Sequence, residues 1–159
     1  MTDHYIIFTV AATSYALPSQ QVAHVEMVDD VTRVPNAPHF VDGVVFSRGA
    51  VVPALSLRAR FGFERQPFDS RTRLLVVQSD GRTVGLIVDS AREFMTIPPT
   101  AIKPASDALT GMSGRYIRGI ATLTDRMIIV LELDRVLDVD DAALAAVTDM
   151  ATGLSQETR

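Results

Sequence analysis

Three histidines and a group of aspartates are the side chains in this chain best suited to acid–base or metal chemistry. His4, His24 and His39 lie far apart in the sequence, and no two of them have a metal-binding spacing. The aspartates within 138–141 directly precede a predicted helix, where negative charge favours the N-terminal end of the helix dipole. The chain has no cysteine, which removes thiolate nucleophiles and sulfur ligands. The sequence therefore nominates no catalytic residue, no metal site and no cofactor.

One turn carries residues suited to a protein contact. Arg48 and Gly49 lie between two apolar runs, where a hairpin turn is expected because glycine readily takes a positive φ. Exposed arginine is ordinary, so turn chemistry explains the pair by itself. Arginine is nevertheless enriched among interface hot spots, and its planar fork suits a carboxylate on a partner. Residue type alone favours a plain turn and leaves a contact anchor open.

Composition narrows the class of protein. The chain has 159 residues, 47% hydrophobic content and a net charge of −4, which suits one domain or two tightly joined subdomains. The acidic balance and the absence of tryptophan argue against binding of nucleic acid, which needs basic residues interleaved with aromatics. The apolar runs are too short to span a bilayer. We expect a soluble, cytoplasmic protein without direct membrane insertion.

The chain contains an internal repeat. Residues 40–61 align without a gap with residues 116–137, and Gly43 matches Gly119. Shorter parallels upstream pair 15–17 with 84–86 and 21–28 with 90–97. Because a fixed repeat usually marks a repeated structural unit, the molecule is predicted to consist of two related halves.

The halves are predicted to be built from strands. Short runs rich in valine, isoleucine and aromatic residues, bounded by turn residues, are typical of an all-β fold. Strands are expected near 5–11, 14–17, 23–28, 41–46, 51–57, 74–78, 84–89, 93–97, 117–123 and 127–133. The proline-rich segments 35–38 and 98–114 are expected to be loops that cannot continue a strand. Short helices are expected at 18–22, 57–61 and 134–137.

The repeat and the strands together predict a single domain over 1–159 with two small barrels. The first barrel would cover mainly 14–61 and the second mainly 72–137, with 62–71 as the connector between them. Five strands in each half suit a closed barrel, because closure removes exposed strand edges. A C-terminal helix is predicted over 140–152.

A set of motifs in a fixed order extends from about residue 5 to residue 147. They are 31–33, Pro35, Pro38, Gly43, Arg48-Gly49, Pro53, Leu57-Arg58, 84–89, 116–119 and 125–128. In these motifs the chain resembles the CheW family of bacterial chemotaxis coupling proteins. The resemblance implies two SH3-like five-stranded β-barrels packed over a shared apolar core. It also implies a non-enzymatic adaptor that joins the regulatory domain of a CheA-type histidine kinase to the cytoplasmic tip of methyl-accepting chemoreceptors, recruited to membrane receptor arrays.

The resemblance further implies which positions contact these partners. They are Val22, His24, Gly43, Phe46, Arg48, Gly49, Phe94 and Gly119. From residue type alone, core packing is the favoured explanation for Val22 and Phe94, and backbone conformation is the favoured explanation for the glycines. Arg48 favours a contact once the family is considered.

Several positions depart from the family pattern. Phe46 and Ser47 replace the Asn-Leu of an Asn-Leu-Arg-Gly motif, Ser56 replaces the aspartate of Asp-Leu-Arg, and His24 replaces an acidic residue. We expect these changes to alter the surface around the contact. A CheW-like adaptor in another chemosensory pathway, such as pilus-based motility, therefore stays open, as does a small-molecule-binding barrel protein. Nothing in the sequence nominates the convergent polar pocket that an enzyme would need.

Overall fold

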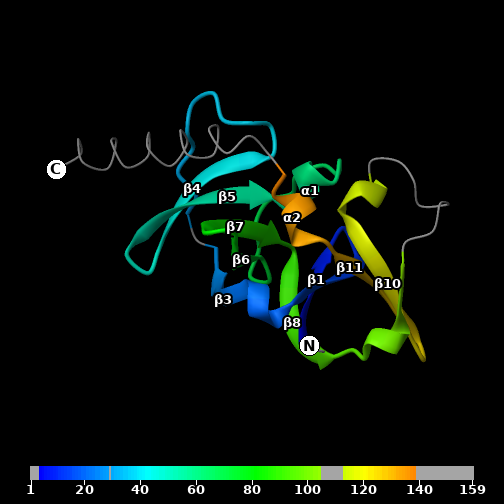
Figure 1. Ribbon diagram of the computed structural model, residues 1–159. Coiled ribbons are helices and arrows are strands. Elements are labelled where there is room, and N and C mark those ends of the chain that lie inside the picture. Colours follow the sequence, from blue (N-terminus) through cyan, green and yellow to red (C-terminus); the bar gives the residue numbers. More distant parts are fainter. Residues whose placement is uncertain (1–3, 29, 105–112, 139–159) are drawn as a thin grey trace.

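Strands dominate the computed structural model, which describes residues 4–28, 30–104 and 113–138 (Figure 1). The strands are β1 (His4–Val10), β2 (Thr13–Pro18), β3 (Val22–Met27), β4 (Val41–Ser47), β5 (Ala50–Ser56), β6 (Arg73–Ser79), β7 (Arg82–Val88), β8 (Ser90–Thr96), β9 (Ile102–Pro104), β10 (Ile117–Leu123) and β11 (Arg126–Leu131). The helical pieces are α1 (Leu57–Arg60), α2 (Leu133–Val136) and the 3₁₀ turns η1 (Ser19–Gln21), η2 (Pro99–Ala101) and η4 (Ser113–Tyr116). The predicted all-β class is confirmed. The predicted helix over 140–152 lies outside the described residues.

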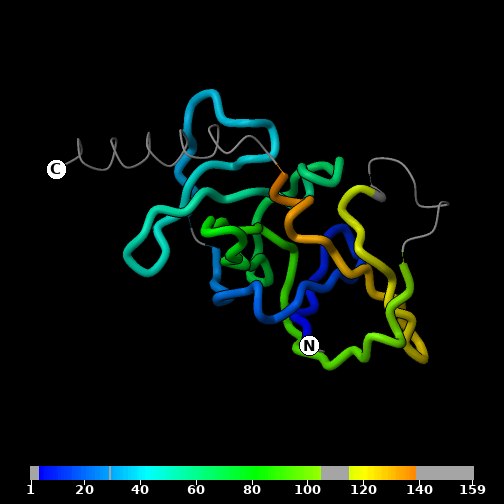
Figure 2. Tube along the Cα trace, viewed as in Figure 1, coloured from blue at the N-terminus to red at the C-terminus, as the bar shows by residue number. Residues whose placement is uncertain are grey.

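The strands form two sheets. Sheet A has the order β8-β1-β2-β11-β10-β9, and sheet B has the order β3-β6-β7-β5-β4. Neighbouring strands are antiparallel except for β2 beside β11 and β5 beside β7, which run parallel. In Figure 2 the blue N-terminal hairpin lies beside the orange segment of β11, so the two ends of the described fold meet in sheet A.

The repeat found in the sequence is a structural repeat. The β4–β5 hairpin leads into α1 as the β10–β11 hairpin leads into α2, and each hairpin has a bulge before its matched glycine, Gly43 or Gly119. The backbone amide of Ser56 donates to the carbonyl of Phe40 at 2.8 Å, and the matched amide after β11 donates to the Tyr116 carbonyl at the same distance. The two halves therefore repeat down to single hydrogen bonds.

The sheets do not follow the predicted division into 14–61 and 72–137. Sheet B takes all strands from β3 to β7, whereas sheet A combines β1 and β2 with β8 to β11. Sheet A therefore joins the β1–β2 hairpin of the first half to the β10–β11 hairpin of the second half. Sheet B joins the β6–β7 hairpin of the second half to the β4–β5 hairpin of the first half. The segment 62–71 connects α1 to β6 within sheet B and does not separate two modules. Hydrophobic periodicity shows where strands occur but not which distant strands pair, which is why the sequence suggested separate halves.

One expected loop contains a strand. The segment 98–114 includes β9, which pairs with β10 through Lys103 opposite Ile120 and Pro104 opposite Gly119. Proline has no backbone N–H to donate to a neighbouring strand. Because β9 lies at the edge of sheet A and has a neighbour on one side only, Pro104 is tolerated there. The proline content was therefore compatible with a short strand at this edge.

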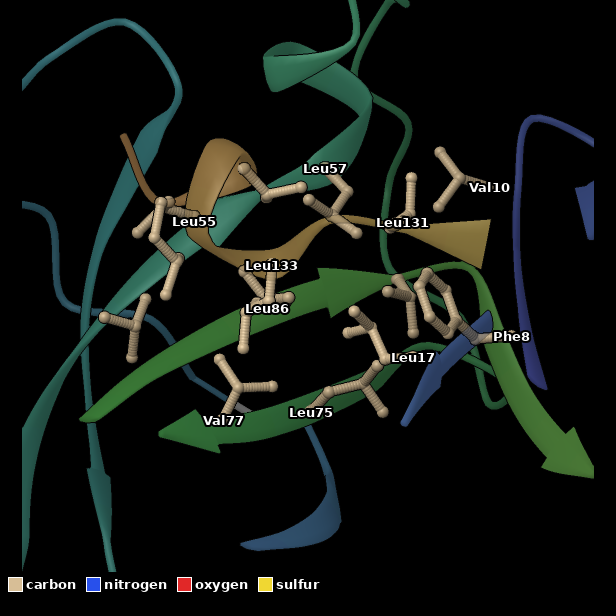
Figure 3. Packing of buried hydrophobic residues seen from close by; sticks show 14 of the residues in the cluster. Phe8, Val10, Leu17, Leu55, Leu57, Leu75, Val77, Leu86, Leu131 and Leu133 are labelled. Atoms are coloured by element: carbon tan, nitrogen blue, oxygen red, sulfur yellow. The ribbon is translucent and has the colours of Figure 1, made fainter. Parts of the chain in front are cut away.

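The largest apolar cluster lies between the two sheets (Figure 3). It takes Phe8 and Leu17 from sheet A and Leu75 and Leu86 from sheet B, all almost fully buried. Burial of each such side chain contributes about 1.5–3 kcal/mol. The predicted shared apolar core is confirmed, and it is the main contact that fixes the sheets relative to one another.

Each sheet also encloses an apolar cluster of its own. On β1, Phe8 faces the shared core whereas Ile7 belongs to a cluster within sheet A. On β6, Leu75 faces the shared core whereas Leu74 belongs to a cluster within sheet B. Because successive side chains of a strand point to opposite faces, both sheets must curl around an interior.

Arg60 connects the ends of the two halves. Its guanidinium lies 4.5 Å from the ring centre of Phe40 and 5.0 Å from that of Tyr116, which are matched positions of the repeat. Its Nε donates to the carbonyl of Val136 at the end of α2, at 3.0 Å. Burial lowers the pKa of Arg60 from its ordinary value. The junction between the halves is therefore fixed by a cation held against aromatic rings.

Candidate partner-binding surface

The predicted contact residues fall on separate parts of the molecule. Most of them lie in sheet B on β3, on β4 and in the turn before β5. Phe94 lies on β8 and Gly119 on β10, and the strands β1, β2 and β11 separate β8 from β10 within sheet A. The structure thus brings the sheet B positions into one region and leaves Phe94 and Gly119 elsewhere.

A side-chain cluster joins the two edges of sheet B. The Nε2 atom of His24 on β3 lies 3.1 Å from the Oγ atom of Ser47 on β4. The Ser47 hydroxyl donates to the carboxylate of Glu26, which also contacts His24. Within the described part of the chain β3 and β4 share no backbone ladder, so these side chains hold the curled sheet together. His24 is a half-buried link in this cluster and not a freely solvated side chain.

The tip of the β4–β5 hairpin presents the most exposed aromatic side chain of the described residues. Phe46 is 74% exposed, whereas its neighbour Ser47 is 4% exposed. Arg48 and Gly49 form a two-residue turn with φ values of 48° and 85°, the combination that a tight hairpin favours. We call Phe46, Arg48 and Gly49 the hairpin surface. The β4–β5 turn extends beyond the rest of sheet B, in teal at the left of Figure 1.

The opposite edge of sheet B adds exposed apolar area. On β3 the side chains alternate, with His24 and Glu26 directed to Ser47 and with Val25 and Met27 exposed. The exposed fractions are 39% for Val25 and 64% for Met27. Exposure of apolar side chains to water is unfavourable. Exposed apolar residues on both edge strands, β3 and β4, are therefore typical of a protein contact surface.

Two of the three glycines predicted as contacts, Gly43 and Gly119, have clear packing roles. A Cβ atom on Gly43, whose φ is +148°, would lie 2.0 Å from the carbonyl oxygen of Thr32. A Cβ atom on Gly119 would lie 2.6 Å from the carbonyl oxygen of Lys103. In each half the bulge lets a crossing segment approach the hairpin, and only glycine leaves enough space. Val22 likewise packs, partly buried, against the shared core.

Phe94 belongs to a second exposed area on sheet A. Its side chain is 63% exposed, and its ring stacks on His4 with a centroid distance of 5.5 Å. The adjacent residue Glu93 forms an ion pair with Arg126 of β11 at 2.9 Å, and this hydrogen-bonded pairing lowers the pKa of Glu93. Met127, next to Arg126, is 62% exposed. Phe94 is therefore not a core residue, and packing does not explain its presence.

Two of the departures from the family pattern are buried. Ser47 is 4% and Ser56 is 5% exposed, so the expectation that they change the surface is corrected. Ser56 caps α1, because its hydroxyl accepts a hydrogen bond from the Ala59 amide at 3.2 Å. Phe46 is the departure that changes the exposed surface most.

Sequence reasoning missed the role of one ion pair. The Nε and Nη2 atoms of Arg58 donate to the two carboxylate oxygens of Asp89 at 2.8 and 2.6 Å. Asp89 also accepts the backbone amide of Ala11 at 2.8 Å. This hydrogen bonding raises the pKa of Arg58. The pair connects α1, the end of β7 and the β1–β2 turn. A signal was available, because both residues belong to the motifs that carried the family resemblance.

The described residues contain no candidate metal cluster and no helix that could span a membrane. In these ranges no group of three histidine, cysteine or acidic side chains could hold a metal ion. Over the same ranges every buried side-chain nitrogen and oxygen has a hydrogen-bond partner. None of the helices described is long and apolar enough to cross a membrane. The surface features that need explanation are therefore the exposed apolar and arginine side chains.

Comparisons with known proteins agree with this geometry. A profile of the CheW-like domain family matches residues 4–141. The chain is 31% identical over 136 residues to the chemotaxis protein CheW of Helicobacter pylori, covering 86% of this chain and 82% of that protein. It is 29% identical over 142 residues to CheW of Klebsiella aerogenes, covering 89% and 86%. The crystal structure of the scaffolding protein TtCheW from Thermoanaerobacter tengcongensis is similar with a TM-score of 0.79 and 29% identity, over 88% of this chain and 95% of that chain.

Proposed function

This chain belongs to the family of CheW-like domains, and from that membership we propose that it is a non-enzymatic adaptor in bacterial chemotaxis signalling. Its partners are the regulatory domain of a CheA-type histidine kinase and the cytoplasmic tip of a methyl-accepting chemoreceptor. It would accordingly act in the cytoplasm, at membrane receptor arrays. The observation that carries the proposal is the exposed Phe46 beside Arg48 on a hairpin held in place by buried side chains.

The hairpin surface has the properties of an interaction hot spot. Aromatic and arginine side chains supply most of the binding free energy at many interfaces. Phe46 offers apolar area, and Arg48 offers a fork for a carboxylate, without an ion pair or hydrogen bond elsewhere in the described chain. Because Ser47 between them is fixed to β3, little conformational entropy is lost when a partner binds.

Signal transmission by such an adaptor is thermodynamic. An adaptor shifts the kinase equilibrium only by the difference in its affinity for the active and inactive arrangements. The shared core joins sheet A rigidly to sheet B, so contacts on Phe94 of sheet A and on the hairpin surface of sheet B belong to one body. One partner bound at Phe94 and another bound at the hairpin surface would therefore be held in a fixed position relative to each other.

Binding measurements with purified partners test the function. We expect the chain to bind both the kinase regulatory domain and a receptor cytoplasmic fragment from the same genome in isothermal titration calorimetry. Phe46→Ser and Arg48→Glu should each weaken binding of one partner by about 10- to 100-fold, which corresponds to about 1–3 kcal/mol. Circular dichroism should show an unchanged fold, because both side chains are exposed.

Phe63→Ser is the matched control, since Phe63 is a 42% exposed aromatic residue on the segment after α1. It should bind both partners as the unchanged chain does. Absence of binding to either partner would contradict the adaptor function. Equal affinities of Phe46→Ser, Arg48→Glu and Phe63→Ser would instead exclude the hairpin surface while leaving the adaptor function intact.

A further inference from the structure

A cleft of about 580 Å³ lies beside the segment that follows α1, on the side of the molecule where residues of both sheets come together. Sheet A contributes Thr9 of β1 and Ser90 of β8, and sheet B contributes Ser56 and Ile87. Cavities that bind small molecules commonly have volumes of about 300–1,000 Å³. The cleft is large enough for a ligand and does not include the hairpin surface.

The charges that line this cleft are almost, but not completely, balanced. Three arginines each pair with an aspartate of the lining. The pairs are Arg58 with Asp89 at 2.6 Å, Arg65 with Asp42 at 2.7 Å and Arg71 with Asp69 at 3.2 Å. The fourth arginine of the lining, Arg33, is exposed and has no ion pair or hydrogen bond within the described chain. Arg33 therefore lines the cleft with its hydrogen-bond donors free for an anion.

The other half of the internal repeat has different residues at several of these positions. In each half a backbone carbonyl packs against the bulge glycine, that of Thr32 against Gly43 and that of Lys103 against Gly119. The next residue is Arg33 in the first case and Pro104 in the second. By the alignment of the halves, Arg58 corresponds to Asp134, and Asp89 corresponds to Gln20. The other half therefore builds the same backbone with no arginine at the positions of Arg33 and Arg58. Arg58 has a structural role through its pair with Asp89, whereas neither the repeated fold nor an ion pair among the described residues accounts for Arg33.

The rest of the lining is partly apolar. Val31, Ile87 and Phe68 line the cleft together with the charged residues. An inorganic ion would use only the charge, whereas a ligand with an apolar body would use both kinds of side chain. We propose that the cleft binds a small organic anion, carrying a carboxylate or phosphate head on an apolar body, and that Arg33 holds the head. Guanidinium forms paired hydrogen bonds with either head group.

This site is distinct from the adaptor contacts and adds a ligand to the function. Its lining connects the β1–β2 region and β8 of sheet A with β5, β7 and the segment 65–72 of sheet B. A bound anion would therefore contact both sheets and should stabilise their mutual arrangement. By linkage, a ligand that binds only the folded state raises the melting temperature.

Nuclear magnetic resonance titrations test the proposal. The ¹⁵N-labelled full chain is titrated with sodium benzoate, phenyl phosphate and the neutral benzyl alcohol. We expect at least one anion to shift the amide signals of Arg33, Ile87 and the 65–72 segment, with an affinity at least about fivefold above that of benzyl alcohol. The stronger of the two anions identifies the head group, and inorganic phosphate should bind more weakly than phenyl phosphate.

Arg33→Ala should weaken binding of that anion by about tenfold, and Arg33→Lys should weaken it less because the charge is kept. Arg118→Ala is the control, since Arg118 is an exposed arginine of β10 outside the cleft. It should bind as the unchanged chain does. Equal binding of the anions and benzyl alcohol, or equal affinities of Arg33→Ala and Arg118→Ala, would overturn the proposal. Unchanged signal dispersion in each variant confirms that the fold is intact.

Discussion

Asp89, which directly follows β7, connects three segments of the chain through its carboxylate. Its two oxygens accept three hydrogen bonds, from Arg58 twice and from the Ala11 amide once. The side chains of Arg58 and Asp89 are only 15% and 31% exposed, so the pair is partly shielded from solvent. A partly buried ion pair is costly to break from one side, because the remaining charge loses its compensation. The strength of this link therefore depends on both members being present.

Asp89→Ala should consequently destabilise the chain by about 2 kcal/mol, since it leaves a partly buried guanidinium and an amide without an acceptor. Urea denaturation followed by circular dichroism measures the change. Asp69→Ala is the control, because its ion pair with Arg71 is exposed on both sides. It should lower the free energy of unfolding clearly less. Equal losses in the two variants would show that the Arg58 pair is no more than a surface contact.

Ser47 is the residue on which the geometry of the hairpin surface depends. Its buried hydroxyl contacts His24 and donates to Glu26, so it joins β4 to β3. Ser47→Ala should reduce the free energy of unfolding by about 1–2 kcal/mol and increase hydrogen exchange of the β4–β5 amides. Thr83→Ala, which removes an exposed hydroxyl of β7, should change neither quantity. Unchanged exchange in Ser47→Ala would mean that the hairpin is held without this cluster.

At the scale of elements, the bulge of the β4–β5 hairpin requires glycine at position 43 for two reasons, the backbone conformation and the lack of space for a side chain. A Cβ atom on Gly43 would overlap the Thr32 carbonyl oxygen at 2.0 Å, in a backbone conformation that side chains rarely adopt. Gly62 also has a positive φ, but a Cβ atom there meets open space. Gly43→Ala should therefore cost about 2 kcal/mol or more, and Gly62→Ala only about 1 kcal/mol.

Thermal and urea unfolding of the two variants provide the comparison. Gly62→Ala is the matched control, because it adds the same methyl group at a glycine that also has a positive φ, without the steric overlap. If Gly62→Ala destabilised the chain as much as Gly43→Ala, strain alone would explain both losses. The close approach of the segment around Thr32 to β4 would then contribute nothing to the requirement for glycine.

Individual elements were predictable where local chemistry determines them. The helices at 57–61 and 134–137 were expected and correspond to α1 and α2, and the Asp80-Gly81 turn joins β6 to β7. The strand β9 was not expected, because its segment is rich in proline. Proline is excluded from central strands but tolerated in edge strands such as β9. Arg48 was placed correctly in a turn, whereas the burial of Ser47 depends on the meeting of β3 and β4, which lie at opposite edges of one sheet. Such contacts are set by sheet curvature, which local sequence does not reveal.

At the scale of the whole molecule, the two halves of the repeat are interlocked. The parallel pairs that join them are equivalent, with Ala54 opposite Gly85 in sheet B and Val130 opposite Ala16 in sheet A. The repeat itself could be read from the sequence, but the exchange of hairpins could not. Pairing a hairpin with its own half or with the other half buries similar apolar faces, so the periodicity is the same in both cases.

The interlocking predicts that neither half is stable alone. A fragment of residues 1–71 lacks the β6–β7 hairpin beside β5, and a fragment of residues 72–159 lacks the β1–β2 hairpin beside β11. Each fragment would also expose its part of the shared core, including Leu17 in one and Leu86 in the other. We expect circular dichroism of each isolated fragment to show little strand structure and no cooperative unfolding. An equimolar mixture should recover the strand signal, because the missing neighbours are supplied. Cooperative unfolding of either fragment alone would instead indicate that one half carries a complete core, in contrast to the arrangement of sheets A and B.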